Sequence, residues 1–275
     1  MVPTASIVTI TFSLLVALLL PVAVLLFYAL KNRGSKIFSA WFLGAAGFFV
    51  TQMLIRVPIL AVLQTKRWFM EFAGNTPFLY AFSLAFTAGL FELAGRYVVA
   101  RSMKKGGLNY RRSLAAGLGH GGIEAMILVG MSYITNLVYV IMINTGDFES
   151  LVDLVAASGL DVSQFLLLKD TLVNTHPGLY LLGGFERILA MTCHVGMSMV
   201  VCYFVREGKA LRGCLISLII HTLIDLTAGI SLLIGNGLTQ AQAYVIIYSI
   251  LSLAAILSIL IIRKIHRQWA EKEEK

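Results

Sequence analysis

The chain has 275 residues, of which 58% are hydrophobic and 13% are charged, and its mean hydropathy is +0.84. Soluble domains carry about 25% charged residues, so this composition excludes a soluble globular protein and predicts an all-α, polytopic membrane helix bundle. The net charge of +8 does not indicate a nucleic-acid partner, because the basic residues lie in short loops and in a tail at 263–275 rather than on one binding face.

Seven apolar stretches are long enough to cross a bilayer, which takes about 20 helical residues. We expect the first to be a retained spanning helix, because it lacks the basic region and the cleavage site of a signal peptide. The longest connection, 144–179, mixes acidic with apolar residues and predicts one or two short helices at the membrane surface. We expect a single membrane domain over 1–275, with the site helices at about 78–262. The predicted spans are 6–30, 37–63, 78–100, 113–143, 180–205, 214–234 and 241–262.

The basic loop residues predict how the chain is oriented in the cell membrane. Sixteen Lys and Arg residues follow the first, third, fifth and seventh spans, and only Lys66, Arg67 and Lys169 lie in the opposite loops. The positive-inside rule therefore predicts an outside N-terminus and a cytoplasmic C-terminus. The sixteen are Lys31, Arg33, Lys36, Arg101, Lys104, Lys105, Arg111, Arg112, Arg206, Lys209, Arg212, Arg263, Lys264, Arg267, Lys272 and Lys275.

Ionisable side chains inside the predicted spans gather at one depth. Glu124 and Asp225 each lie four residues beyond a histidine, and the i,i+4 spacing places each pair on one helix face. Intramembrane ionisable residues are costly and commonly functional, so four helices with such groups at one level predict a shared site. Four side chains lie eight to twelve residues from a predicted cytoplasmic end, ~12–18 Å deep, and they are Glu92, His120, His194 and His221.

Three imidazoles with nearby carboxylates suit zinc, whose catalytic sites use three His, or two His and a carboxylate, and leave a position for water. We predict that His120, His194 and His221 bind the ion. Glu124 is the predicted general base, with Glu92 in reserve. A metal-free water site held by Glu and His is the alternative. The remaining candidate catalytic side chains are Glu186, Asp225 and Arg187, and either Arg187 or Arg96 could stabilise an oxyanion or hold a carboxylate.

Some of these polar side chains also have structural interpretations. Polar contacts between membrane helices contribute about 0.6–2 kcal/mol, so a single pair does not require a function. Glu92 and Arg96 are four residues apart and can form an ion pair within one helix. Arg56 in the second span is expected to be a structural partner or to extend towards the membrane surface. Three buried histidines at one depth are harder to explain as structural contacts.

Three motifs together resemble the YhfC family of intramembrane metalloproteases. They are G-H-G-G-I-E at 119–124, E-R-x-x-A-x-x-x-H at 186–194 and H-x-x-x-D at 221–225. The resemblance covers nearly the whole chain, including the number of spans. The family is similar to the CAAX-protease and bacteriocin-processing group, which includes the PrsW-type proteases, and to the scaffold subunit of gamma-secretase.

The chain departs from the wider group's motifs at three positions. Ala190 stands where the group's F-x-x-x-H motif has Phe, and Asp225 stands where its H-x-x-x-N motif has Asn. Glu92 and Arg96 match the E-x-x-x-R half of E-E-x-x-x-R, but Phe91 replaces the first Glu. The resemblance thus leaves two candidates for the general base, Glu92 and Glu124.

These observations predict an intramembrane endopeptidase that hydrolyses a membrane-embedded or membrane-proximal bond of a peptide or protein substrate. A non-catalytic membrane scaffold is one alternative, because the gamma-secretase scaffold keeps histidines without an independent protease role. An ion- or proton-coupled transporter is another, since intramembrane His, Asp and Glu also form proton relays. The sequence has no internal repeat of the kind that many transporters show. Bound metal would favour the protease, and substrate-dependent ion flux would favour the transporter.

Overall fold

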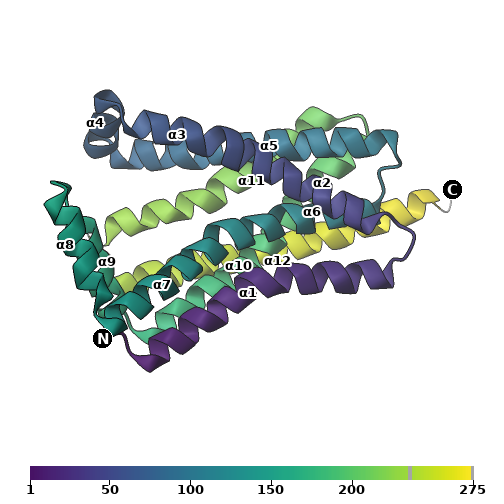
Figure 1. Ribbon diagram of the computed structural model, residues 1–275. Helices are drawn as coiled ribbons and strands as arrows, with labels where there is room; N and C mark the ends of the chain where they lie inside the picture. Colours follow the sequence, from purple (N-terminus) through teal and green to yellow (C-terminus); the bar gives the residue numbers. More distant parts are fainter. Residues whose placement is uncertain (235–236, 274–275) are drawn as a thin grey trace. The chain divides into compact units, whose positions relative to one another are not determined.

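The computed structural model describes residues 1–234 and 237–273, and within these ranges the regular structure is helical, with no strand (Figure 1). Long apolar stretches favour helices in a membrane, because a helix satisfies every backbone hydrogen bond within its own segment. In chain order the helices are α1 (Thr4–Lys31), α2 (Ile37–Phe48), η1 (Phe49–Arg56), α3 (Val57–Gln64), α4 (Arg67–Asn75), α5 (Pro77–Lys105), α6 (Tyr110–Glu124), η2 (Ala125–Gly130), α7 (Met131–Thr145), α8 (Asp147–Ala157), α9 (Ser163–Asn174), α10 (Pro177–Arg206), α11 (Ala210–Asp225), η3 (Leu226–Leu233) and α12 (Gln240–Glu273).

Seven helices in the described ranges are long and apolar enough to cross a membrane, which confirms the predicted all-α bundle and its number of spans. Three of the seven contain irregular turns. The second and fourth include π-helical segments, η1 and η2, and the sixth ends in the 3₁₀ segment η3. The spans are Thr4–Lys31, Ile37–Gln64, Pro77–Lys105, Tyr110–Thr145, Pro177–Arg206, Ala210–Leu233 and Gln240–Ala270.

The chain divides into two compact units, one of Met1–Val22 with Ala125–Ile188 and one of Ala23–Glu124 with Leu189–Lys275. Helices α1 and α10 contribute to both units, so the chain passes between them without an interdomain linker. The single membrane domain expected from the sequence, and the basic tail assigned to 263–275, stay predictions.

The first unit contains the long connection, which forms the two short helices α8 and α9. Two hydroxyl groups, of Ser13 and Tyr133, each donate to the Tyr180 carbonyl oxygen at 2.8 Å. These bonds tie α1 and α7 to the start of α10. An exposed ion pair from Lys169 of α9 to Glu149 of α8 keeps the pKa of the Glu149 carboxyl below its usual value. That α8 and α9 lie on the membrane surface stays a prediction.

In the second unit, glycines let α2 approach α6 and α5 closely (Figure 1). A Cβ atom on Gly44 would lie 1.9 Å from the Ala116 carbonyl oxygen, and one on Gly119 would lie 1.9 Å from that of Trp41. Small residues permit such close backbone packing between membrane helices. Helix α11 also packs against α5. This packing places α5, which carries Glu92, between helices that also bear polar side chains.

The orientation of the chain stays a prediction, because helix packing alone does not distinguish the two membrane faces. We expect topology reporters fused at Gly107 and at the C-terminus to be active in the cytoplasm, and a reporter fused at Ser158 to be active outside. The physical reason is the excess of Lys and Arg on one side. Cytoplasmic activity of the Ser158 fusion would contradict the predicted orientation.

Candidate metal centre

The carboxylate of Glu92 is the centre of a buried polar cluster in the second unit. Its Oε2 lies 3.0 Å from His120 Nε2, 2.8 Å from His221 Nε2 and 3.6 Å from His194 Nδ1. These histidines come from three different helices, α6, α11 and α10. All four side chains are buried. The groups that the sequence placed at one depth therefore surround a single oxygen atom.

Two further side chains donate hydrogen bonds to the same carboxylate. Gln52 donates from Nε2 to Glu92 Oε1 at 2.8 Å, and Arg96 donates from Nη2 to Oε2 at 2.9 Å. An ionised carboxylate only accepts, so hydrogen bonds from His120 and His221 place a proton on the Nε2 atom of each ring. The Glu92–Arg96 ion pair expected from the sequence is present, and it is part of the larger cluster.

His194 joins this cluster to Glu124. Arg96 Nη2 lies 2.6 Å from His194 Nδ1, and because a guanidinium only donates, Nδ1 is the accepting nitrogen of the ring. The ring proton is then on Nε2, which lies 2.6 Å from Glu124 Oε2. Hydrogen bonds thus connect Glu92 through Arg96 to His194, and a close ion-pair contact extends the chain of polar groups to Glu124.

Asp225 and His221 form the second contact between imidazole and carboxylate. The Nδ1 atom of His221 lies 3.3 Å from Asp225 Oδ2, one helical turn further along α11. Each nitrogen of His221 therefore faces a carboxylate oxygen, Asp225 on one side and Glu92 on the other. A carboxylate on the far nitrogen is how proteins commonly fix the orientation of a metal-binding histidine. Asp225 is also the more solvent-exposed of the two carboxylates, at 34% of its side chain.

Glu92, His194 and His221 could together hold a metal ion, because each offers a ligand atom within 4.8 Å of the other two. Two histidines and one carboxylate are an established donor set for catalytic zinc, so the residues fit such an ion. His120 is not part of this triad, although the sequence predicts it as a ligand, and it hydrogen-bonds to Glu92 instead. Arg96 contacts two of the three candidate ligand residues, Glu92 and His194.

The remaining predicted site residues lie elsewhere in the chain. Glu186 and Arg187 hydrogen-bond to each other in the first unit, and their assignment to the site stays a prediction. Arg56 donates to the Leu84 carbonyl oxygen at 2.7 Å and contacts Gln52 Oε1 at 3.4 Å. It therefore supports the residue that binds Glu92.

Gln52 is the residue of this cluster that the sequence analysis missed. It lies in the π-helical segment η1, and such segments are common at functional sites but leave no periodic pattern in a sequence. The available signal was its place four residues before Arg56, on the same polar side of an otherwise apolar span. Its side chain is buried, and its Nε2 also lies 3.3 Å from the Ala88 carbonyl oxygen.

We expect Gln52→Leu to weaken zinc binding by about 10–100-fold, the usual cost of losing a hydrogen bond that orients a metal ligand. The leucine keeps the volume of the side chain but cannot donate to Glu92 Oε1. Competition titration of the purified protein with a zinc chelator measures the affinity. Thr51→Val is the matched control, because the Thr51 hydroxyl donates only to the Gly47 carbonyl oxygen within its own helix. Wild-type affinity in Gln52→Leu would contradict the orienting role.

The fold and the cluster define a polytopic membrane protein with a buried candidate metal centre between its spans. The chain belongs to the YhfC intramembrane metalloprotease family, whose model matches residues 16–249. It is 35% identical over 270 residues to the uncharacterized membrane protein YhfC of Bacillus subtilis (strain 168), and the alignment covers 97% of this chain and 99% of that protein. No solved structure matches the chain. The family predicted from the three motifs and the multi-pass membrane location are therefore confirmed.

Proposed function

We propose that this protein is an intramembrane endopeptidase that hydrolyses a membrane-embedded or membrane-proximal peptide bond at the Glu92 cluster. The observation that carries the proposal is the close approach of Glu92, His194 and His221 in the apolar interior of the spans. The family description as a metalloprotease agrees with it. Five charged or ionisable side chains on one cluster exceed what helix association alone requires, which argues against a scaffold.

In this proposal Glu92, His194 and His221 hold a zinc ion. When bound, such an ion polarises a carbonyl group and lowers the pKa of water, which supplies a nucleophile at neutral pH. Gln52 and Asp225 orient two of the ligands, Gln52 through its hydrogen bond to Glu92 and Asp225 through its ion-pair contact with His221.

Glu124 is the proposed general base, because it is the buried carboxylate of the cluster that is not in the metal-binding triad. It takes the proton from the attacking water and returns it to the leaving amine. Its close contact with His194, 2.6 Å from Nε2 to Oε2, holds the carboxylate in position. Arg96 is suited to stabilise the negative charge that develops on the carbonyl oxygen. Its Nε and Nη1 atoms are buried and have no hydrogen-bond partner among the described residues, so both remain able to donate.

The metal-binding part of the proposal predicts one zinc per chain in protein purified without chelator, measured by elemental analysis. We expect His194→Ala and His221→Ala to lose the metal, because each removes one of three donors. His120→Ala should retain it at reduced affinity, because His120 only donates to Glu92. The matched control is His176→Ala, an exposed histidine of the first unit. Loss of zinc in His120→Ala as complete as in His221→Ala would instead favour His120 as a ligand.

The proteolytic part is tested with purified protein in lipid vesicles, incubated with a pool of single-span membrane peptides and analysed by mass spectrometry. We expect fragments from wild type and none from His221→Ala. Ion flux that depends on the cluster, without any cleavage, would favour the transporter. A zinc-bound protein that captures peptides without cutting them would favour the scaffold.

A further inference from the structure

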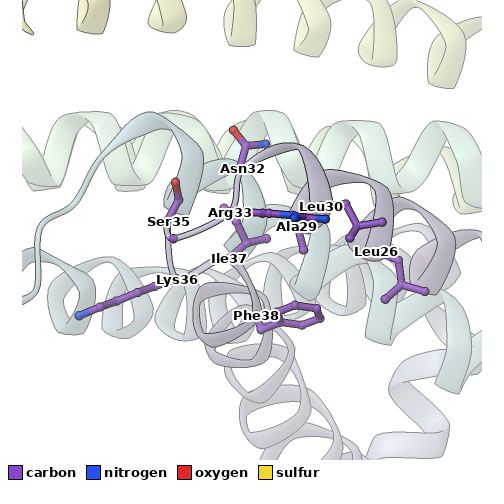
Figure 2. Close-up of a pocket in the computed structure, with 10 residues that line it drawn as sticks. Leu26, Ala29, Leu30, Asn32, Arg33, Ser35, Lys36, Ile37 and Phe38 are labelled. Carbon is purple, nitrogen blue, oxygen red and sulfur yellow. The ribbon is translucent and has the colours of Figure 1, made fainter.

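A second candidate binding site lies in the same unit as the cluster but does not include any of the cluster's residues. It is a hollow of about 410 Å³ where α1 ends and α2 begins (Figure 2). Its lining includes Leu26 and Leu30 from α1, Arg33 and Ser35 from the turn, and Lys36 and Phe38 from the start of α2. None of these residues takes part in the proposed peptide hydrolysis.

The lining has an apolar side and a cationic side. Leu26, Leu30 and Phe38 are exposed large apolar side chains near the ends of two helices that are long and apolar enough to span a membrane. Arg33 and Lys36 supply two positive charges, and among the residues that the structure describes no carboxylate lines the hollow. Arg111 of α6 adds a third charge nearby, because its Nη1 lies 3.4 Å from Ser35 Oγ. The three positive charges therefore lie near the ends of the two predicted spans, next to the apolar side of the hollow.

The turn between the two helices holds the cationic side in an unusual backbone conformation. Lys36 has a φ of +53°, a left-handed value that costs a residue with a side chain free energy and is often found where a protein grips a ligand. Gly34 of the same turn has a φ of +83°, which glycine adopts without strain. The connection is therefore only a few residues long, and Figure 2 shows that Arg33 extends towards Ala29 and Leu30, whereas the ammonium group of Lys36 lies at the rim and points away from them.

We propose that this hollow binds the headgroup of an anionic phospholipid, with the phosphate at Arg33, the charge of Lys36 adding to the attraction from the rim, and the acyl chains along Leu26, Leu30 and Phe38. The pairing of a basic pocket with an apolar wall at a span end matches the two parts of such a lipid. A zwitterionic headgroup would bring its ammonium group towards the same cations, so an anionic one is preferred. The predicted orientation places the hollow at the cytoplasmic leaflet, which is rich in anionic lipids.

The test uses the full-length protein in detergent, titrated with phosphatidylglycerol or phosphatidylcholine, with bound lipid counted by native mass spectrometry. Wild type should bind phosphatidylglycerol in preference. One basic residue at a membrane surface contributes roughly fivefold to binding, so Arg33→Gln with Lys36→Gln should weaken phosphatidylglycerol binding about 10–30-fold. The unfolding temperature of the lipid-free variant, measured alongside, shows that it is folded.

The matched control removes two charges from the same predicted membrane face without touching the hollow, by Lys31→Gln with Arg101→Gln. This variant should bind phosphatidylglycerol as wild type does. An equal loss in the control would overturn the proposal in favour of a diffuse surface-charge effect, and so would a wild type without headgroup preference. Glycerol phosphate, which has no acyl chains, should not displace the lipid at equal concentration. Equal displacement would overturn the role of the apolar wall.

Discussion

Replacing Glu92 with glutamine should remove the bound zinc and all detectable peptide cleavage, a larger effect than any other isosteric change in this chain. The wild-type carboxylate accepts hydrogen bonds from Gln52, Arg96, His120 and His221. A glutamine amide turns one oxygen into a donor, so at least one buried donor then faces another donor. A buried unsatisfied group costs about 1–3 kcal/mol. The amide is also a poor zinc ligand, because metal-binding carboxylates act in the ionised form.

The measurements are zinc content, peptide cleavage and the unfolding temperature in lipid vesicles. Glu71→Gln is the matched control, because Glu71 pairs with Arg67 on an exposed face of α4 and should change none of the three. Stoichiometric zinc in Glu92→Gln would contradict the assignment of Glu92 as a ligand. If that variant keeps zinc but does not cleave, Glu92 becomes the general base.

The membrane spans were predictable because the bilayer imposes the same requirement on each of them independently. A stretch of about 20 apolar residues is sufficient evidence for a span, and no knowledge of its neighbours is needed. That His120, His194 and His221 lie level with one another was predictable for the same reason, since counting residues along a helix locates a side chain along the helix axis. The pairing of His221 with Asp225 follows from one turn of a single helix.

The composition of the triad was not predictable, because it depends on how each helix is rotated against the others. Glu92 and His120 lie at the same depth, and their spacing along the chain does not show which of them faces His194 and His221. The close packing of α2 on α6 at Gly44 and Gly119 sets that rotation. The π-helical turn that presents Gln52 also depends on tertiary packing, and no periodic pattern in the sequence indicates it.

The motifs grouped Glu186 and Arg187 with His194, because all three lie on the predicted fifth span. They do share helix α10, but the two compact units divide that helix at Ile188. Residues on one long helix can thus belong to different packing units, which a motif cannot reveal. Their catalytic roles stay predictions, and the Glu92 and Glu124 variants test the proposed chemistry without them.

Glutamine at position 124 should leave the fold and the zinc in place while slowing peptide cleavage by ~10²–10⁴-fold, the usual cost of losing a general base. The reason is that the amide keeps an oxygen facing His194 Nε2, which lies 2.6 Å from the carboxylate oxygen in the wild-type chain. It cannot, however, take a proton from water. Zinc content and cleavage are measured on the same vesicle preparation as for Glu92→Gln.

Asp225 is the second carboxylate that contacts a histidine. Comparing its amide variant with that of Glu124 shows whether Glu124 acts as a general base or only orients its histidine. Asp225→Asn also keeps an accepting oxygen for its histidine, His221, and should reduce cleavage far less than Glu124→Gln does. If Glu124 only orients His194, the two amide variants should lose cleavage to a similar and small extent. Normal cleavage by Glu124→Gln, together with inactive Glu92→Gln, would transfer the role of general base to Glu92 and support a metal-free water site.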